Sequence, residues 1–165
     1  MPARLLGSTG LLVSRLGLGL AALGRPAYIN LGRSEDFGHQ RGVADLQRRC
    51  HDMLNAAYAA GIRYVDVARS YGMAEAFFGT WLRDRNLPND AITIGSKWGY
   101  SYVGAWRLDA SVHEVKDLSV DTLHRQIAES RALLGDRLHL VRGHDRGRPV
   151  AQHRPGPLIW PLHDM

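Results

Sequence analysis

The chain has 165 residues, 45% of them hydrophobic, which suits one domain with a sizeable apolar core. Its net charge of +5 invites a nucleic-acid interpretation. The arginines are spread along the chain instead of gathering on one face, so we expect no nucleic-acid partner. No apolar run approaches the ~20 residues of a membrane span, and the N-terminus lacks the pattern of a signal peptide. We therefore expect no membrane association.

Cysteine usage favours a reducing compartment. Cys50 is the single cysteine, so no internal disulfide can form, and this suits the cytoplasm. Cys50 also falls on the apolar stripe of a predicted helix, and we interpret it as a core residue rather than a nucleophile. We assign no metal ligands.

The N-terminal part of the chain predicts a β-hairpin followed by a first strand. Residues 4–16 carry a turn, Gly7-Ser8-Thr9-Gly10, between apolar pairs. Residues 16–23 predict the strand, in which Gly17 and Gly19 indicate close backbone approach. Their spacing is not a dinucleotide fingerprint of the Rossmann type, because no third glycine opens a helix after it.

Helical and β-prone segments alternate through the middle of the chain. Apolar residues at helical spacing predict three helices, over residues 44–60, 74–82 and 119–135. Short β-prone runs predict three further strands, at residues 62–68, 91–97 and 138–143. This order predicts an α/β fold with about four parallel strands joined by right-handed crossovers.

Polar side chains stand at the ends of two neighbouring strands. Asp66 lies inside an apolar run, where an unpaired carboxylate would be costly to bury, and Tyr71 follows five residues later. The next strand ends on Lys97. Parallel strands would carry these three side chains to one rim, which is where barrel enzymes place their active sites. The alternative is a core strand with a tolerated aspartate and a turn tyrosine.

These motifs resemble the aldo-keto reductase family. The family pattern D-T-A-x-x-Y-G, followed by a strand that ends in T/S-K, is matched by residues 66–72 and by Ser96-Lys97. Ala74-Glu75, residues 78–82 and the N-terminal residues 4–19 are similar to further family signatures. The resemblance covers Ala3 to about Leu140, and its motifs come in the family's order.

The resemblance implies a partial (β/α)8 TIM barrel with an N-terminal β-hairpin and about four parallel strands. A complete barrel typically takes about 250 residues, so we assign residues 1–140 to the N-terminal part of an NADP-dependent oxidoreductase barrel, apparently truncated. Residues 141–165 are rich in arginine and proline and lack periodicity, which predicts an irregular tail. The tail is interpreted either as an out-of-frame or degenerate sequence or as a genuine disordered extension.

The resemblance also implies that the protein reduces aldehyde or ketone carbonyls of small molecules with NADPH. No side chain can donate a hydride, so the cofactor must supply it. Tyr71 would give a proton to the carbonyl oxygen, and the ammonium of Lys97 would strengthen this acid by stabilising tyrosinate. Asp66 would keep the amine of Lys97 protonated and directed at Tyr71, and it would also contact the cofactor.

A fourth site residue follows from the same resemblance. The family carries a histidine at the end of the fourth strand, in a pattern like L-Y-Q-I-H. His144 falls at the matching distance from Leu140, although the three residues between them differ from the pattern. We interpret His144 as a donor that polarises the carbonyl; if the tail is out of frame, the match is a coincidence. The loops that grip the cofactor phosphates would follow the last two strands of a complete barrel.

A second hypothesis is a truncated, non-catalytic remnant that self-associates. Four parallel strands cannot close a barrel, so the outer strands would leave unpaired edges. We also expect several apolar residues to face the missing half of the barrel and to lose part of their cover: Leu18, Leu20, Val65, Ile92 and Ile94.

Overall fold

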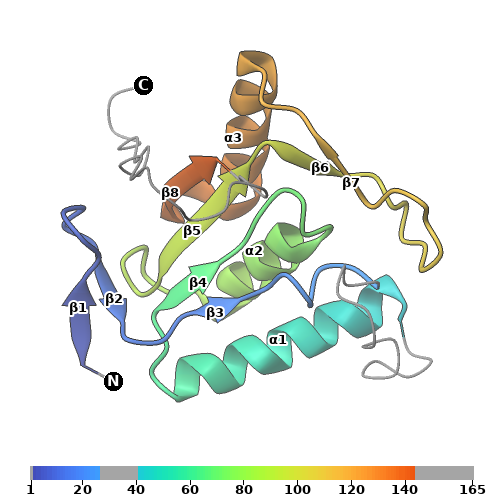
Figure 1. Cartoon of the computed structure of the whole chain (residues 1–165). Coiled ribbons are helices and arrows are strands. Elements are labelled where there is room, and N and C mark those ends of the chain that lie inside the picture. The colour runs from blue at the N-terminus through green and yellow to red at the C-terminus, as the bar shows by residue number, and fades with distance from the viewer. Residues whose placement is uncertain (1, 27–40, 144–165) are drawn as a thin grey trace.

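The computed structural model describes residues 2–26 and 41–143, and its centre is one parallel sheet (Figure 1). The N-terminal hairpin pairs β1 (Ala3–Leu5) with β2 (Leu12–Ser14) in antiparallel register. The sheet has the order β3-β4-β5-β8, and all of its pairs are parallel. Its strands are β3 (Leu18–Gly19), β4 (Tyr64–Asp66), β5 (Thr93–Trp98) and β8 (Leu138–Gly143). The hairpin, the four strands and the parallel pairing confirm the predicted partial barrel.

A helix follows each of the first three strands of this sheet. The helices are α1 (Val43–Ala59), α2 (Ala74–Arg85) and α3 (Val120–Leu134), and the short 3-10 helix η1 (Gly135–Arg137) leads from α3 into β8. Figure 1 shows α2 lying between α1 and α3 beside the sheet. Helix α1 ends where Gly61 adopts a φ of +86°, a conformation that glycine reaches without strain.

The hydrophobic core fills the space between the sheet and the helices. Leu46, Cys50 and Leu54 form the buried stripe of α1, which confirms Cys50 as a core residue. Burial also raises the pKa of the Cys50 thiol to about 12, so the thiol stays protonated. Aromatic side chains of α2 complete the core, with Phe78 stacked on Trp81.

The expectation that apolar strand residues face the missing half of the barrel is wrong. Leu20, Val65, Ile92 and Ile94 are at most 4% exposed and belong to the core, and Leu18 packs against it. The reason is strand parity, because alternate residues point to opposite faces of a sheet. The apolar set faces the helices, while Tyr64 lies over Gly17 and Gly95 on the other face.

The connection from β5 to α3 contains a hairpin that was not predicted from the sequence. Strands β6 (Tyr100–Tyr102) and β7 (Glu114–Lys116) pair in antiparallel register. A buried ion pair of 2.7 Å joins Glu114 to Arg25 in the loop after β3. Trp106 packs edge-on against Phe77 and donates a hydrogen bond to the carbonyl of Arg41. These contacts hold the hairpin against the loop after β3, the start of α1 and α2.

Strand β8 spans the residues of the predicted β-prone run at 138–143, so its last three residues fall within the range assigned to the irregular tail. It ends at Gly143, with Trp98 as the register partner of that glycine. The rest of the predicted tail, residues 144–165, lies outside the described residues. Among the described helices, none has both the length and the apolar character needed to cross a bilayer.

Candidate active site

Three of the residues singled out in the sequence meet at one point. The ammonium of Lys97 lies 2.5 Å from Oδ2 of Asp66 and 3.1 Å from the hydroxyl oxygen of Tyr71. Its third contact is the carbonyl oxygen of Val67, also at 3.1 Å. An ammonium has three N–H donors, and each of them has an acceptor here.

Strand pairing explains why these residues meet. Asp66 is the last residue of β4, and its register partner on β5 is Gly95, two residues before Lys97. Side chains two residues apart on a strand point to the same face. Asp66 and Lys97 therefore share one face of the sheet at the carboxyl ends of adjacent parallel strands.

A tight loop after β4 brings the tyrosine back over the strand end. The N–H of Arg69 donates to the carbonyl of Lys97 at 3.3 Å, and the N–H of Tyr71 donates to the carbonyl of Ala68 at 3.0 Å. Gly72 then takes a φ of +63°, and a Cβ there would lie 2.4 Å from the carbonyl oxygen of Gly24. Only glycine fits this position, so it fixes the turn that follows Tyr71.

The three side chains differ in their access to solvent. Tyr71 and Lys97 are 7% and 6% exposed, whereas a quarter of the Asp66 side chain is exposed. Charges in a partly buried site interact more strongly than in water. The Asp66 carboxylate and the Val67 carbonyl thus hold the Lys97 ammonium beside the phenol. Of these groups, the carboxylate is the more exposed to solvent.

This arrangement can hold and pass a proton. Lys97 donates its hydrogen bond to the phenol oxygen, so the hydrogen of the Tyr71 hydroxyl can be directed to another acceptor. A neighbouring positive charge favours the phenolate that remains after proton transfer. The site therefore has the composition of a general acid with a built-in counter-charge.

The fourth predicted residue, His144, lies outside the described residues. Its role as a carbonyl-polarising donor remains a prediction from the sequence. Within the described ranges, no group of three or more histidine, cysteine, aspartate or glutamate side chains is arranged to hold a metal ion.

A buried carboxylate lies behind this site, at a residue that the sequence motifs included but to which no role was assigned. Glu75 in the first turn of α2 is 1% exposed and accepts hydrogen bonds from Ser96, Ser130 and Arg69. A signal was present in the sequence, because Glu75 lies on the same helical face as Phe78 and Leu82, three and seven residues later. A charged residue within an apolar stripe indicates a buried partner.

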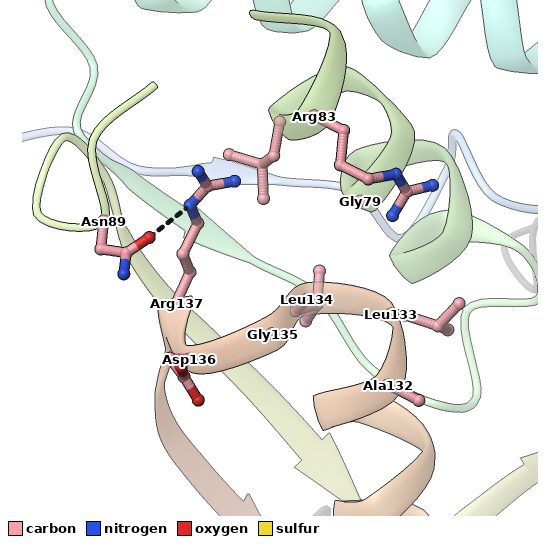
Figure 2. A pocket seen from close by; sticks show the side chains of 10 residues that line it. Gly79, Arg83, Asn89, Ala132, Leu133, Leu134, Gly135, Asp136 and Arg137 are labelled. Carbon is pink, nitrogen blue, oxygen red and sulfur yellow. Dashed lines mark hydrogen bonds between the residues drawn. The ribbon is translucent and has the colours of Figure 1, made fainter. Parts of the chain in front are cut away.

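A cavity of about 250 Å³ lies elsewhere, between α2 and the end of α3 (Figure 2). Arg83 and Leu134 contribute to its wall, and Arg137 at its edge donates to the side chain of Asn89. Asn89 precedes β5 and Arg137 precedes β8, so the cavity is at the end of the sheet where these strands begin. The Tyr71–Lys97 pair is at the opposite end.

The fold and the site define a partial (β/α)8 barrel with a tyrosine, a lysine and an aspartate at the carboxyl ends of its strands. Comparison with known proteins agrees with this class. The family model described as the aldo/keto reductase family matches residues 15–151. The chain therefore belongs to the aldo/keto reductase family, and its relatives are oxidoreductases.

Two curated relatives and one solved structure illustrate the likeness. Pyridoxal 4-dehydrogenase of Microbacterium luteolum is 31% identical over 88% of this chain and 43% of its own length. The NADH-specific methylglyoxal reductase of Escherichia coli K12 is 29% identical over 79% and 37%, respectively. A structure described as an aldo-keto reductase of Pseudomonas aeruginosa is 31% identical, with a TM-score of 0.63 over 88% of this chain and 47% of its own. The chain spans less than half the length of each.

Proposed function

We propose that the protein reduces the carbonyl group of small aldehydes or ketones with NADPH, with Tyr71 as the proton donor. The observation that supports this most directly is the Lys97 ammonium, which binds the Tyr71 hydroxyl at 3.1 Å and Asp66 at 2.5 Å. Membership of an oxidoreductase family supports the reaction class. The cytoplasm is the proposed location, a reducing compartment in which the single buried cysteine would stay a thiol.

The proposed mechanism assigns one task to each side chain. A nicotinamide cofactor, held beside Asp66, would supply the hydride for the carbonyl carbon when bound. As negative charge develops on the carbonyl oxygen, Tyr71 donates its hydroxyl proton to that oxygen. Lys97 keeps its hydrogen bond to the phenol oxygen and stabilises the phenolate that is left. Asp66 orients the ammonium, and after turnover solvent returns a proton to Tyr71.

The described residues are compatible with the nicotinamide end of such a cofactor. Gly19 is the register partner of Asp66, and no atom lies within 4 Å of the position that a Cβ on Gly19 would take. Space is thus left open beside the carboxylate at the end of β3, and Asp66 would be the residue that contacts the cofactor. The preference for NADPH rests on the family resemblance. Because the Escherichia coli relative is named as NADH-specific, both cofactors belong in the assay.

Substitution of Tyr71 by phenylalanine tests the assignment. Tyr71→Phe keeps the ring and removes the proton donor, so turnover of an aldehyde substrate should fall by a factor of roughly 100 or more. Lys97→Met should have a similar effect. Tyr58→Phe on α1 is the matched control, since it removes a hydroxyl from the helical layer, and its turnover should stay within about twofold of the unchanged protein. Near-normal turnover by Tyr71→Phe would exclude Tyr71 as the proton donor.

A competing candidate is the non-catalytic remnant that self-associates. It is favoured by the two outer strands of the sheet, because β3 and β8 each pair with one strand in the described part of the chain. An unpaired strand edge can bind a second edge. Light scattering on the sample used for the assay separates the candidates: oligomers without NADPH- or NADH-dependent turnover support the remnant. A monomer with Tyr71-dependent turnover supports the reductase.

A further inference from the structure

We propose that Glu75 is a positioning residue for the Tyr71–Lys97 pair, acting through Ser96 on β5 and Arg69 in the loop after β4. This inference rests on the proposed function of that pair. Its basis is a single buried carboxylate that binds Ser96, next to Lys97 in the chain, and Arg69, two residues before Tyr71. Glu75 would act through its hydrogen bonds to Ser96 and Arg69.

The first connection runs through strand β5. Oε1 of Glu75 accepts a hydrogen bond from the hydroxyl of Ser96 at 2.6 Å, and Ser96 immediately precedes Lys97. Successive side chains on a strand point to opposite faces. Glu75 therefore holds β5 from the helical side at the place where Lys97 projects from the other side. A shift of Ser96 toward or away from α2 would move the Lys97 ammonium with it.

The second connection runs through the loop that carries the tyrosine. Oε2 of Glu75 binds a guanidinium nitrogen of Arg69 at 2.7 Å, and the backbone N–H of Arg69 bonds the carbonyl of Lys97. Arg69 stands two residues before Tyr71. Glu75 thus holds the side chain of Arg69, while the backbone N–H of Arg69 holds the loop to β5.

Helix α3 completes the environment of the carboxylate. The hydroxyl of Ser130 donates to both carboxylate oxygens of Glu75, at 2.9 and 3.1 Å. On the outer side, Arg69 also binds Glu129 at 2.8 Å, and Arg125 binds Glu129 at 2.9 Å. The buried charge of Glu75 is therefore compensated by one arginine and by hydroxyl donors from two separate elements.

A carboxylate at this depth is costly unless its partners are fixed, and fixed partners make it a rigid anchor. Apolar packing alone would serve the core equally well at this point of α2. The donors lie next to Lys97 on β5, in the loop that carries Tyr71, and on α3, and this distribution is what a positioning role requires. Hydrogen bonds of this kind lock the rotamers that hold a reacting group in place.

The test measures the environment of Tyr71 directly. The protein has six tyrosines, and incorporation of fluorotyrosine gives each one a fluorine NMR signal, with Tyr71→Phe identifying the signal of Tyr71. In Glu75→Gln we expect the Tyr71 signal to shift or broaden while most other signals stay in place. With an aldehyde and NADPH or NADH, kcat should fall about tenfold at an unchanged KM, since a misplacement of roughly 1 Å can lower the rate about 100-fold.

Asp117→Asn is the matched control for the change from a carboxylate to an amide. Asp117 accepts from the Ser119 N–H and from the Thr122 hydroxyl at the start of α3, away from Ser96 and Arg69. This variant should leave the Tyr71 signal and kcat unchanged. Glu75→Asp should restore part of the rate lost in Glu75→Gln, because it keeps the charge for Arg69.

The outcomes separate this inference from the proposed function. If the unchanged protein has no reductase activity, the proposed function fails in this chain, while the fluorine signals still decide whether Glu75 positions Tyr71. If Glu75→Gln does not fold, Ser96→Ala decides, and it should move the Tyr71 signal in the same direction by less. A folded Glu75→Gln or Ser96→Ala protein with a native Tyr71 signal would overturn the inference.

Discussion

Gly79 in α2 offers a sharp test of how the helices are packed. A Cβ added to Gly79 would lie 2.3 Å from the carbonyl oxygen of Leu133 in α3. Figure 2 shows the two residues on the helices that flank the cavity. The atom met is backbone, so no side chain can rotate away. Gly79→Ala therefore forces α2 and α3 apart.

The magnitude follows from two opposing effects. Replacing glycine by alanine inside a helix stabilises it by roughly 0.5–1 kcal/mol. Overpacking a well-filled contact costs about 1–3 kcal/mol, and a clash with backbone belongs at the upper end of that range. The free energy of unfolding should thus fall by about 2 kcal/mol, which for a chain of this length lowers the Tm by roughly 4–8 °C.

Thermal and urea unfolding followed by circular dichroism measure this effect. Gly19→Ala is the matched control, because the same methyl group would meet no atom within 4 Å there. Its free energy of unfolding should stay within about 0.5 kcal/mol of the unchanged protein. A Gly79→Ala protein at least as stable as the unchanged one would refute the close approach of α2 to α3.

Two further predictions concern single buried groups. Burial lowers the pKa of His139 below its usual value, opposed by a backbone hydrogen bond at Arg137, and Nδ1 of His139 accepts the Ile94 N–H at 3.1 Å. Since the unfolded state binds the proton more readily, stability should be lost as pH falls through the unfolded pKa of about 6.5. Unfolding midpoints measured between about pH 7.5 and 5.5 should fall less in His139→Gln; an equal fall in both proteins would contradict this. The Cys50 thiol, buried and with its pKa raised to about 12, should resist an aromatic disulfide reagent until urea unfolds the chain, and rapid labelling of the native protein would disprove its burial.

Local patterns were enough to predict the order of the main elements. Helical stripes and β-prone runs are properties of neighbouring residues, so α1, α2, α3 and the four parallel strands were all expected. The hairpin of β6 and β7 was not predicted, because its anchors are distant in sequence. Glu114 reaches Arg25 across 89 positions, and Trp106 packs on Phe77.

The candidate site shows the same division. Asp66, Tyr71 and Lys97 were predicted to share a rim because parallel strands align their carboxyl ends, and the structure brings them together. Glu75 was assigned no role, although it interrupts an apolar stripe, because two of its partners, Ser96 and Ser130, lie 21 and 55 residues away. The prediction also placed Val65 and Ile94 on the wrong face of the sheet. The apolar residues of a strand show that one face is buried, but they do not show whether that face meets the helices or the barrel interior.

Strand β5 lies between two buried charged groups, the Lys97 ammonium on one face and the Glu75 carboxylate on the other. Lys97 projects from one face and is balanced by Asp66, while Glu75 lies against the other face and is balanced by Arg69. Removing Arg69 would leave the buried Glu75 carboxylate without its cationic partner, whereas Arg69 would keep Glu129 if Glu75 were removed. The loop from Val67 to Gly72 contacts both pairs, because Arg69 binds Glu75 while Val67 and Tyr71 accept hydrogen bonds from Lys97. Both ion pairs therefore add to the backbone hydrogen bonds that hold this loop, and through Glu75 they connect the position of Tyr71 to the packing of α2 and α3.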